Sequence, residues 1–255
     1  MEETNPYPRV LAIVQARMGS CRLPGKPLLS LGDSTLIEQT IRRIRASEIV
    51  SEIVAAIPSH PENRPLRQLC RKQNIPCFAH DGPEEDVLSR LLQAAKVFQA
   101  DVVVRTFACD PLLEPKMLWA SVRYQLDTDM DIVTVGRLPE GTACEVMPLR
   151  TLIHLDSFCR SREDREEVTA FLWRHRELFD CAILPAPLSL RLPGIRLRIQ
   201  TEEDYELLRW IFNTVAPRPN GLIAVRDVLD RLLHHPEQLH KAIGNYAVVH
   251  DPKAA

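Results

Sequence analysis

Residues 15–28, near the start of the chain, gather the residue types that bind phosphate. The three cations and two glycines of this segment are Arg17, Arg22, Lys26, Gly19 and Gly25. Glycine allows backbone conformations and close approaches that a side chain blocks, and the cations attract an anionic ligand. The spacing differs from the GxxxxGK[ST] of a P-loop and from the GxGxxG of a dinucleotide fold. The segment therefore predicts a loop that holds the phosphates of a nucleotide by a motif other than these two.

The elements around this loop predict where it lies. It follows an apolar run at 10–14 that has the length and character of a strand buried on both faces, and similar runs stand at 53–57 and 102–104. Amphipathic segments separate these runs, and the first of them opens with a capping-box signature, Thr35 and Glu38. Such alternation indicates parallel strands joined by crossover helices. Ligands bind such sheets at the carboxyl ends of the strands, which is where this loop begins.

The remaining pattern predicts one α/β domain over residues 1–255, with a Rossmann-like, mostly parallel sheet flanked by helices. Further helices and strands are expected at about 62–72, 84–98, 131–135, 149–158, 163–177, 181–184, 195–199 and 202–214. No repeat or linker composition marks a second domain. The alternation weakens at about 137–185, and the pattern beyond Pro217 is less readable.

Composition indicates the class of ligand. Of the 255 residues, 45% are hydrophobic and 26% charged, and 32 basic residues against 34 acidic ones give a net charge of −2. This balance favours small-molecule ligands over nucleic acid or an anionic membrane. No apolar stretch reaches the roughly 18 residues of a spanning helix, and the polar first residues lack a signal-peptide layout, so a cytoplasmic protein is expected. The seven scattered cysteines lack the spacing of a zinc site and are expected to be mostly reduced apolar fillers.

The loop also carries a family resemblance. Its run from Ala16 to Leu28, Ala-Arg-Met-Gly-Ser-x-Arg-Leu-Pro-Gly-Lys-x-Leu, resembles the signature of the cytidylyltransferase-like proteins of spore-coat polysaccharide biosynthesis, which are related to the CMP-acylneuraminate and CMP-Kdo synthetases. The Glu-Asp-Val-Leu-Ser-Arg run at 85–90 is similar to a common family run, and the likeness continues in order to Thr-x-Glu-Asp at 201–204. The resemblance implies a fold of the nucleotide-diphospho-sugar transferase type. It also implies a nucleotidyltransferase, often homodimeric, that joins a nucleoside triphosphate, usually CTP, to a sugar or sugar acid for polysaccharide or glycoconjugate biosynthesis and releases pyrophosphate.

The resemblance carries roles over to the loop residue by residue. The implied nucleotide-binding residues are Ala16, Arg17, Met18, Gly19, Ser20, Arg22 and Lys26. The three cations among them would act in catalysis by clamping the triphosphate. Attack at the α-phosphorus is helped mainly by positioning and by neutralising charge on the phosphates, so the residue types suit the role.

Arg90, Arg105 and Glu145 are the implied candidates for binding the acceptor. Alternatives stay open for two of them. Arg90 could pair with Asp86 one helical turn away, and Glu145 could be an exposed carboxylate on a loop. Arg105 should end a buried strand, where a positive charge points to an anionic ligand or partner. The less regular segment at about 137–185 would be the place for acceptor binding or dimerisation.

The metal ligands depart from the family pattern. Where the family usually reads Gly-Asp-Cys-Pro-Leu, this chain reads Ala-Cys-Asp-Pro-Leu at 108–112, so Cys109 takes the Asp position and Asp110 follows it. Two further acidic positions of the family are Ala143 and Gln200 here. Mg²⁺ prefers carboxylate oxygens, so Asp110 is the candidate Mg²⁺ ligand and a member of the catalytic set.

Two functional hypotheses follow. The first is an active enzyme in which Mg²⁺ bridges the triphosphate to Asp110. The second is a nucleotide-binding pseudoenzyme or pathway partner that has lost turnover, which the three replaced carboxylates favour. Cys109 is expected to be a small filler rather than a nucleophile, because no His stands near it in the sequence to activate it.

Overall fold

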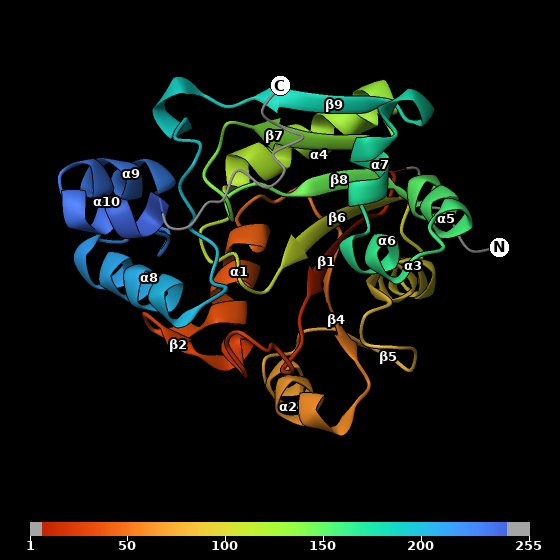
Figure 1. Cartoon of the computed structure of the whole chain (residues 1–255), viewed down its shortest axis with the longest axis horizontal. Helices are drawn as coiled ribbons and strands as arrows, with labels where there is room; N and C mark the ends of the chain where they lie inside the picture. The colour runs from red at the N-terminus through yellow and green to blue at the C-terminus, as the bar shows by residue number, and fades with distance from the viewer. Residues whose placement is uncertain (1–6, 244–255) are drawn as a thin grey trace.

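A computed structural model describes residues 7–243 of the chain, and a seven-stranded sheet in the order β5-β4-β1-β6-β8-β7-β9 forms the centre of this part (Figure 1). Its strands are β1 (Val10–Gln15), β4 (Glu52–Pro58), β5 (Cys77–His80), β6 (Val102–Phe107), β7 (Ile132–Gly136), β8 (Glu145–Pro148) and β9 (Cys181–Pro185). A separate hairpin pairs β2 (Ser30–Leu31) with β3 (Ser34–Thr35).

The strand directions confirm the predicted α/β, mostly parallel sheet. β1 pairs in parallel with both β4 and β6, and β4 with β5, while β8 runs antiparallel to β6 and β7. β9 returns parallel to β7. Because β8 is reversed, its first residues lie at the same edge of the sheet as the last residues of β6.

Helices fill the connections between the strands. The α helices in the described part are α1 (Leu36–Arg45), α2 (Arg64–Lys72), α3 (Val87–Val97), α4 (Pro115–Thr128), α5 (Leu149–Phe158), α6 (Arg162–Glu167), α7 (Ala170–Arg174), α8 (Glu202–Thr214), α9 (Val225–Leu233) and α10 (Pro236–Ile243). Short 3-10 turns are η1 (Lys26–Leu28), η2 (Pro61–Asn63), η3 (Arg176–Leu178) and η4 (Leu188–Leu190). The predicted capping box at Thr35 and Glu38 is present at the start of α1. Among residues 7–243, no helix combines the length and apolar character needed to cross a membrane.

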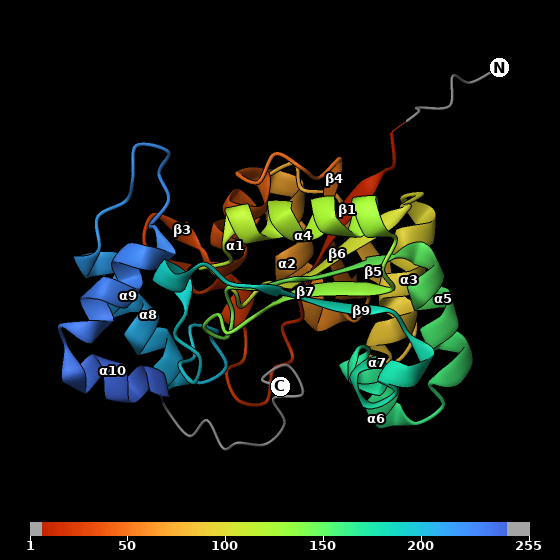
Figure 2. The same ribbon diagram turned by 90° about the horizontal axis from the view of Figure 1, so that it is seen from above.

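Two helix layers cover the sheet, one on each face (Figure 2). Residues of β1 alternate between them: Val10, Ala12 and Val14 join one core cluster, and Leu11 and Ile13 join another. α1, α2 and α4 contribute to the first cluster, and α3, α5 and α7 to the second. Burial on both faces explains why the first strand is a continuous apolar run.

A third unit, formed by α8, α9 and α10, lies at one end of the sheet (Figures 1 and 2). Its apolar side chains form a separate core cluster that includes Leu23 from the loop after β1 and Cys109 from the turn after β6. The unit therefore packs against the predicted phosphate loop through Leu23.

Some expected elements are wrong in their extent. The single helix predicted at 163–177 is broken into α6, α7 and η3, because Val168 has a φ of +62° and ends the first of them. The strand expected at 195–199 makes only an isolated bridge between Glu140 and Arg196. Thr169 of the first segment contacts Arg105, and Arg198 of the second contacts Asp110, so both segments reach the carboxyl edge of the sheet.

Candidate active site

The predicted phosphate loop leaves the carboxyl end of β1 and folds back on itself. The Met18 carbonyl accepts hydrogen bonds from the backbone N–H groups of Ser20 and Gly25, both at 2.9 Å. Gly25 has a φ of +71°, in the left-handed region that favours glycine, and η1 begins immediately after it with Lys26. The hydrogen bond from Gly25 to Met18 therefore closes the loop into a ring, and the cationic Lys26 follows directly after it.

Asn63 fixes this loop to the connection that follows β4. Met18 N donates to Asn63 Oδ1 at 2.9 Å, and Asn63 is fully buried. Ala16 and Ser20 are buried as well, and Ser20 Oγ accepts from Leu23 N at 3.4 Å. Sequence reasoning missed Asn63 because a lone Asn 45 residues from Met18 carries no motif.

The three loop cations have different surroundings. Arg17 Nη1 lies 3.3 Å from Glu84 Oε1, and its Nη2 lies 3.8 Å from Glu166 Oε1. Arg22 is exposed and Lys26 is half-buried. Ion pairs between partly exposed groups contribute about 0–1 kcal/mol, so Arg17 can exchange a carboxylate for a phosphate at small cost.

Asp110 lies in the turn after β6 and is fully buried. Its Oδ1 accepts from Arg198 Nε and its Oδ2 from Arg198 Nη2, both at 2.7 Å. Because a cation of the chain itself occupies both carboxylate oxygens, these residues do not fit an open Mg²⁺ site. The assignment of Mg²⁺ to Asp110 stays an untested prediction. Sequence reasoning missed Arg198, which is 88 residues away, and the only hint was that a buried carboxylate needs a partner.

Neutral residues occupy the three positions where the family has carboxylates, and their surroundings differ. Burial raises the pKa of the Cys109 thiol to about 11, so it stays protonated near neutral pH, which fits a filler rather than a nucleophile. Ala143 lies half-buried in the segment before β8. Gln200 Nε2 donates to Glu140 Oε1 at 3.4 Å.

Arg105 and Glu145, two of the predicted acceptor-binding residues, face each other. They are register partners on β6 and β8, with Nη1 and Oε2 3.0 Å apart, and both are buried. Arg105 also donates to Gln15 Oε1 at 2.5 Å and to Thr169 Oγ1 at 3.0 Å. Burial lowers the pKa of Arg105, and Glu145 opposes this shift. The alternative that Glu145 is an exposed loop carboxylate is therefore wrong.

Phe107, the last residue of β6, lies next to the arginines of both ion pairs, Arg105–Glu145 and Arg198–Asp110. The guanidinium carbons of Arg105 and Arg198 lie 4.9 Å and 4.3 Å from the centroid of its ring. Planar cations over an aromatic face are held in orientation as well as in place. The end of β6 thus presents two fixed guanidinium groups next to the phosphate loop.

Arg90, the third acceptor-binding candidate, lies on α3 and is 2% exposed. Its Nη1 donates to the Glu84 carbonyl at 3.0 Å, and its Nε has no hydrogen-bond partner among the described residues. Asp86 instead caps α3 and pairs with Arg165 at 3.0 Å. Burial first, and then the charge of Arg17, lowers the pKa of Arg90 to about 10. A buried guanidinium with an unpaired N–H suits the anionic group of a ligand.

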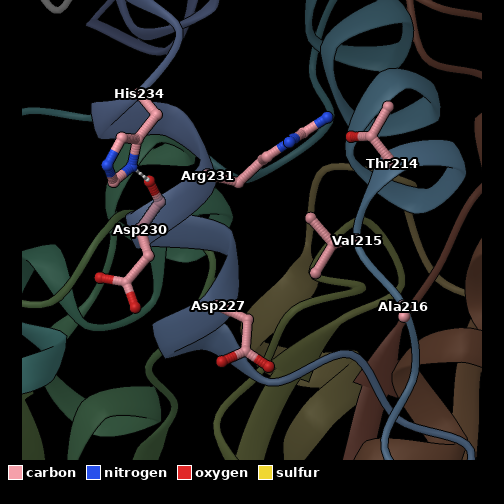
Figure 3. Close-up of a pocket in the computed structure, with 7 residues that line it drawn as sticks. All are labelled: Thr214, Val215, Ala216, Asp227, Asp230, Arg231 and His234. Carbon is pink, nitrogen blue, oxygen red and sulfur yellow. Dashed lines mark hydrogen bonds between the residues drawn. The ribbon is translucent and has the colours of Figure 1, made fainter.

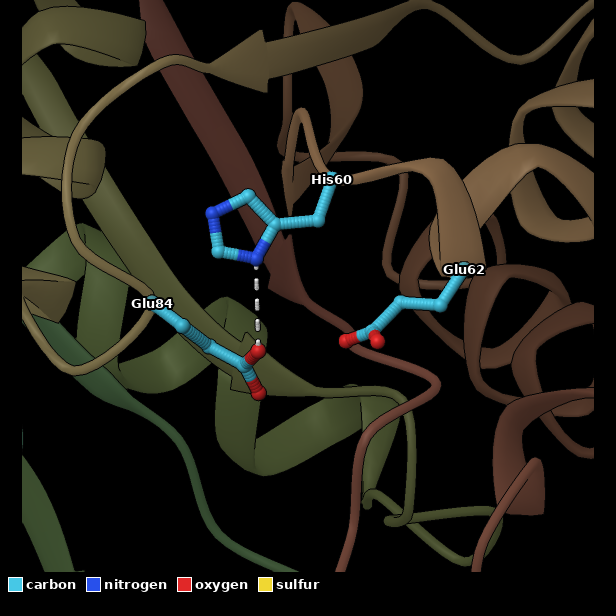
Figure 4. Close-up of side chains that lie close together, drawn as sticks. All are labelled: His60, Glu62 and Glu84. Atoms are coloured by element: carbon cyan, nitrogen blue, oxygen red, sulfur yellow. Dashed lines mark ion pairs between the residues drawn. The ribbon is translucent and has the colours of Figure 1, made fainter.

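His60, Glu62 and Glu84 form a group beside the loop that could hold a cation (Figure 4). Their ligand atoms lie within 4.8 Å of one another, and His60 Nδ1 is 3.7 Å from Glu84 Oε2. A Cβ added at Gly19 would lie 2.9 Å from Glu62 Oε1 and 3.1 Å from Glu84 Oε1, so both carboxylates touch the loop. Arg17 already supplies a positive charge to Glu84.

A separate pocket lies between the end of α8 and α9 (Figure 3). Its lining residues are Thr214, Val215, Ala216, Asp227, Asp230, Arg231 and His234. His234 Nδ1 is 2.7 Å from the backbone carbonyl oxygen of Asp230, so this ring nitrogen is already occupied by a hydrogen bond within the helix. This pocket contains none of the predicted site residues.

Known proteins resemble this chain over nearly its whole length. The family model described as "Cytidylyltransferase" matches residues 11–209. The spore coat polysaccharide biosynthesis protein SpsF of Bacillus subtilis is 30% identical over 234 residues, which cover 89% of this chain and 95% of that protein. An uncharacterized protein of Methanocaldococcus jannaschii is 30% identical over 232 residues, or 90% and 92% of the two chains. The solved structure of a cytidylyltransferase from Leptospira borgpetersenii matches with a TM-score of 0.83 at 26% identity, covering 96% of this chain and 100% of that one.

Proposed function

This chain belongs to the cytidylyltransferase family, and on that premise we propose that it transfers a cytidylyl group from CTP to a sugar or sugar acid for polysaccharide or glycoconjugate synthesis. The observation that carries the proposal is the closed loop after β1, in which Gly25 and the Met18 carbonyl shape a ring bordered by cations. Family membership makes the chain a nucleotidyltransferase. The choice of CTP is supported by the family description, and the role in polysaccharide synthesis by the name of the Bacillus subtilis relative.

The proposed reaction follows from the charges at the loop. An oxygen of the acceptor attacks the α-phosphorus, the bond from that phosphorus to the oxygen that bridges it to the β-phosphorus breaks, and pyrophosphate leaves. Where the attacking group is a hydroxyl, its proton passes to water. Arg17, Arg22 and Lys26 bind the phosphates and neutralise the charge that develops on the leaving group. The attacking hydroxyl or carboxylate is oriented by residues on the neighbouring strands, which reduces the entropy lost in reaching the transition state.

Arg90 is the strongest candidate for orienting the acceptor. Its unpaired Nε lies near the charge of Arg17, so a carboxylate of a sugar acid would complete its hydrogen bonds. Arg105 and Glu145 already satisfy each other, and we propose that they shape the acceptor side by holding β6 and β8 in register.

The experiment is pyrophosphate release from CTP with a panel of sugars and sugar acids, together with CTP binding by calorimetry. Replacing Lys26 or Arg22 with Ala should weaken CTP binding by about tenfold, or ~1.4 kcal/mol, because each removes a charge-assisted phosphate contact. Lys116→Ala, which removes an exposed cation on α4, is the matched control. Unchanged affinity in Lys26→Ala and Arg22→Ala would remove the phosphate clamp from the proposal.

A second candidate is a nucleotide-binding partner without turnover, and the neutral residues Cys109, Ala143 and Gln200 favour it. The same assay separates the two candidates. CTP binding without pyrophosphate release from any acceptor in the panel supports the pseudoenzyme, whereas release with one acceptor supports the transferase.

We extend the proposal to a cytoplasmic homodimer whose contact involves the segment 137–185. Large apolar side chains that are 44–54% exposed lie in this segment: Ile153, Phe158 and Leu178. Light scattering on the purified protein should give twice the mass of the chain, and a Phe158→Ser, Leu178→Ser variant should shift it towards a monomer. A wild-type mass of one chain would refute the dimer.

A further inference from the structure

The residues at the carboxyl edge of the sheet do not fit the Mg²⁺ site that the family resemblance implies. The three positions expected to bear carboxylates are neutral, and the adjacent carboxylate, Asp110, is fully buried against Arg198. A metal ion at Asp110 would have to displace a guanidinium that makes two hydrogen bonds of 2.7 Å. A cation of the chain itself therefore pairs with the carboxylate that the sequence analysis named as the candidate metal ligand.

We infer that Arg198, held by Asp110, replaces the divalent cation in binding the triphosphate, so that nucleotide binding does not require a metal ion. The inference rests on the proposed function, because it takes CTP as the ligand. A carboxylate paired with a guanidinium is neutral overall, so the pair of Asp110 and Arg198 adds no net negative charge that would repel the triphosphate.

The backbone of Arg198 is fixed from two sides. Gly141, with a φ of +90°, packs so closely that an added Cβ would lie 2.8 Å from Arg198 N. On the other side, Ile199 N donates to the Cys109 carbonyl at 3.0 Å. The guanidinium itself lies over the Phe107 ring. Arg198 is thus preorganised, as a group that stabilises charge on a ligand needs to be.

The guanidinium of Arg198 also lies near the phosphate loop and retains hydrogen-bonding capacity. Cys109, whose carbonyl accepts from the residue after Arg198, lies in the same core cluster as Leu23 of the loop, and Arg198 and the loop cation Lys26 both act electrostatically on its thiol. A guanidinium has five N–H donors, of which Asp110 takes two, and Nη1 stays 3.6 Å from Glu140. N–H groups therefore remain for phosphate oxygens. The Arg198 side chain is 20% exposed, whereas the Asp110 side chain has no exposed surface.

The test is calorimetric titration of CTP in Mg²⁺ and in EDTA. The wild-type protein should bind CTP with dissociation constants that agree within about threefold in the two buffers, or ~0.7 kcal/mol. In Arg198→Met the EDTA affinity should fall about tenfold, and Mg²⁺ should restore most of it because Asp110 and Glu140 become available as ligands. Arg196→Met, which breaks the neighbouring ion pair with Asp204, is the matched control and should leave the metal dependence unchanged.

A second variant covers the risk that Arg198→Met does not fold with Asp110 unpaired. Asp110→Asn combined with Arg198→Met removes both charges, so CTP binding should be weak in EDTA and should stay weak in Mg²⁺. The inference is overturned if the wild type binds CTP at least about tenfold more tightly with Mg²⁺, or if Arg198→Met shows the wild-type ratio. No CTP binding in either buffer overturns the proposed function as well, whereas Mg²⁺-dependent binding overturns this inference alone.

Discussion

Arg105 and Glu145 form a buried cross-strand ion pair, with Nη1 and Oε2 3.0 Å apart, at the point where β6 ends and the reversed strand β8 begins. The pair lies at the carboxyl edge of the sheet, and Thr169 Oγ1 is within 3.0 Å of both side chains. A single pair therefore joins β6, β8 and the start of α7. These contacts of Arg105, Glu145 and Thr169 stabilise the carboxyl edge of the sheet, from which the predicted phosphate loop extends.

Replacing Glu145 with Gln should destabilise the fold by about 3 kcal/mol, because Arg105 loses its counter-charge in a buried position. Urea unfolding followed by circular dichroism measures the change. The double variant Arg105→Met, Glu145→Leu should recover most of the loss, since it removes both charges. A loss in Glu145→Gln below about 1 kcal/mol, the size typical of surface pairs, would contradict this account.

Replacing Glu84 with Gln should strengthen CTP binding about threefold in EDTA, because Arg17 loses a competing carboxylate 3.3 Å away. Calorimetry gives the affinity. Glu52→Gln is the control, since its partner Arg9 lies at the opposite edge of the sheet, before β1. If Glu84→Gln instead weakens binding only when Mg²⁺ is present, the group of His60, Glu62 and Glu84 acts as a cation site.

Cys109 should resist alkylation by iodoacetamide at pH 8, whereas the exposed Cys21 of the phosphate loop should react. Burial raises the pKa of the Cys109 thiol to about 11, so little thiolate forms at that pH and the reagent has little access. Mass spectrometry of the digested protein reports both sites. In urea both cysteines should react. Equal rates for Cys109 and Cys21 in the folded protein would show that Cys109 is an accessible thiolate.

Replacing Cys109 with Asp should restore a carboxylate at the family position and make CTP binding respond to Mg²⁺. The expected gain in affinity on adding Mg²⁺ is about tenfold, or ~1.4 kcal/mol. Cys109→Asn matches the size of the new side chain without its charge and should show no such gain. If the Cys109→Asp variant binds CTP no better in Mg²⁺ than in EDTA, the lack of a carboxylate at position 109 does not account for the absence of a Mg²⁺ site.

Local sequence patterns predicted the features that depend on neighbouring residues. The apolar run of β1, the capping box at Thr35 and the spacing from Arg17 to Lys26 predicted a central strand followed by a loop and a helix, and the structure has these elements there. That the loop binds phosphate stays a prediction. Such features are readable because hydrophobic period, cap chemistry and turn glycines act over a few residues.

Which charged groups pair depends on how distant segments pack together. Asp110 and Arg198 are 88 residues apart, and Arg105 and Glu145 are 40 apart. No local pattern encodes these pairings: the first depends on where the chain returns after β9, and the second on the reversal of β8. A buried charge must find its partner through the packing of whole elements, so the sequence could name Asp110 as a candidate but could not show that Arg198 already holds it.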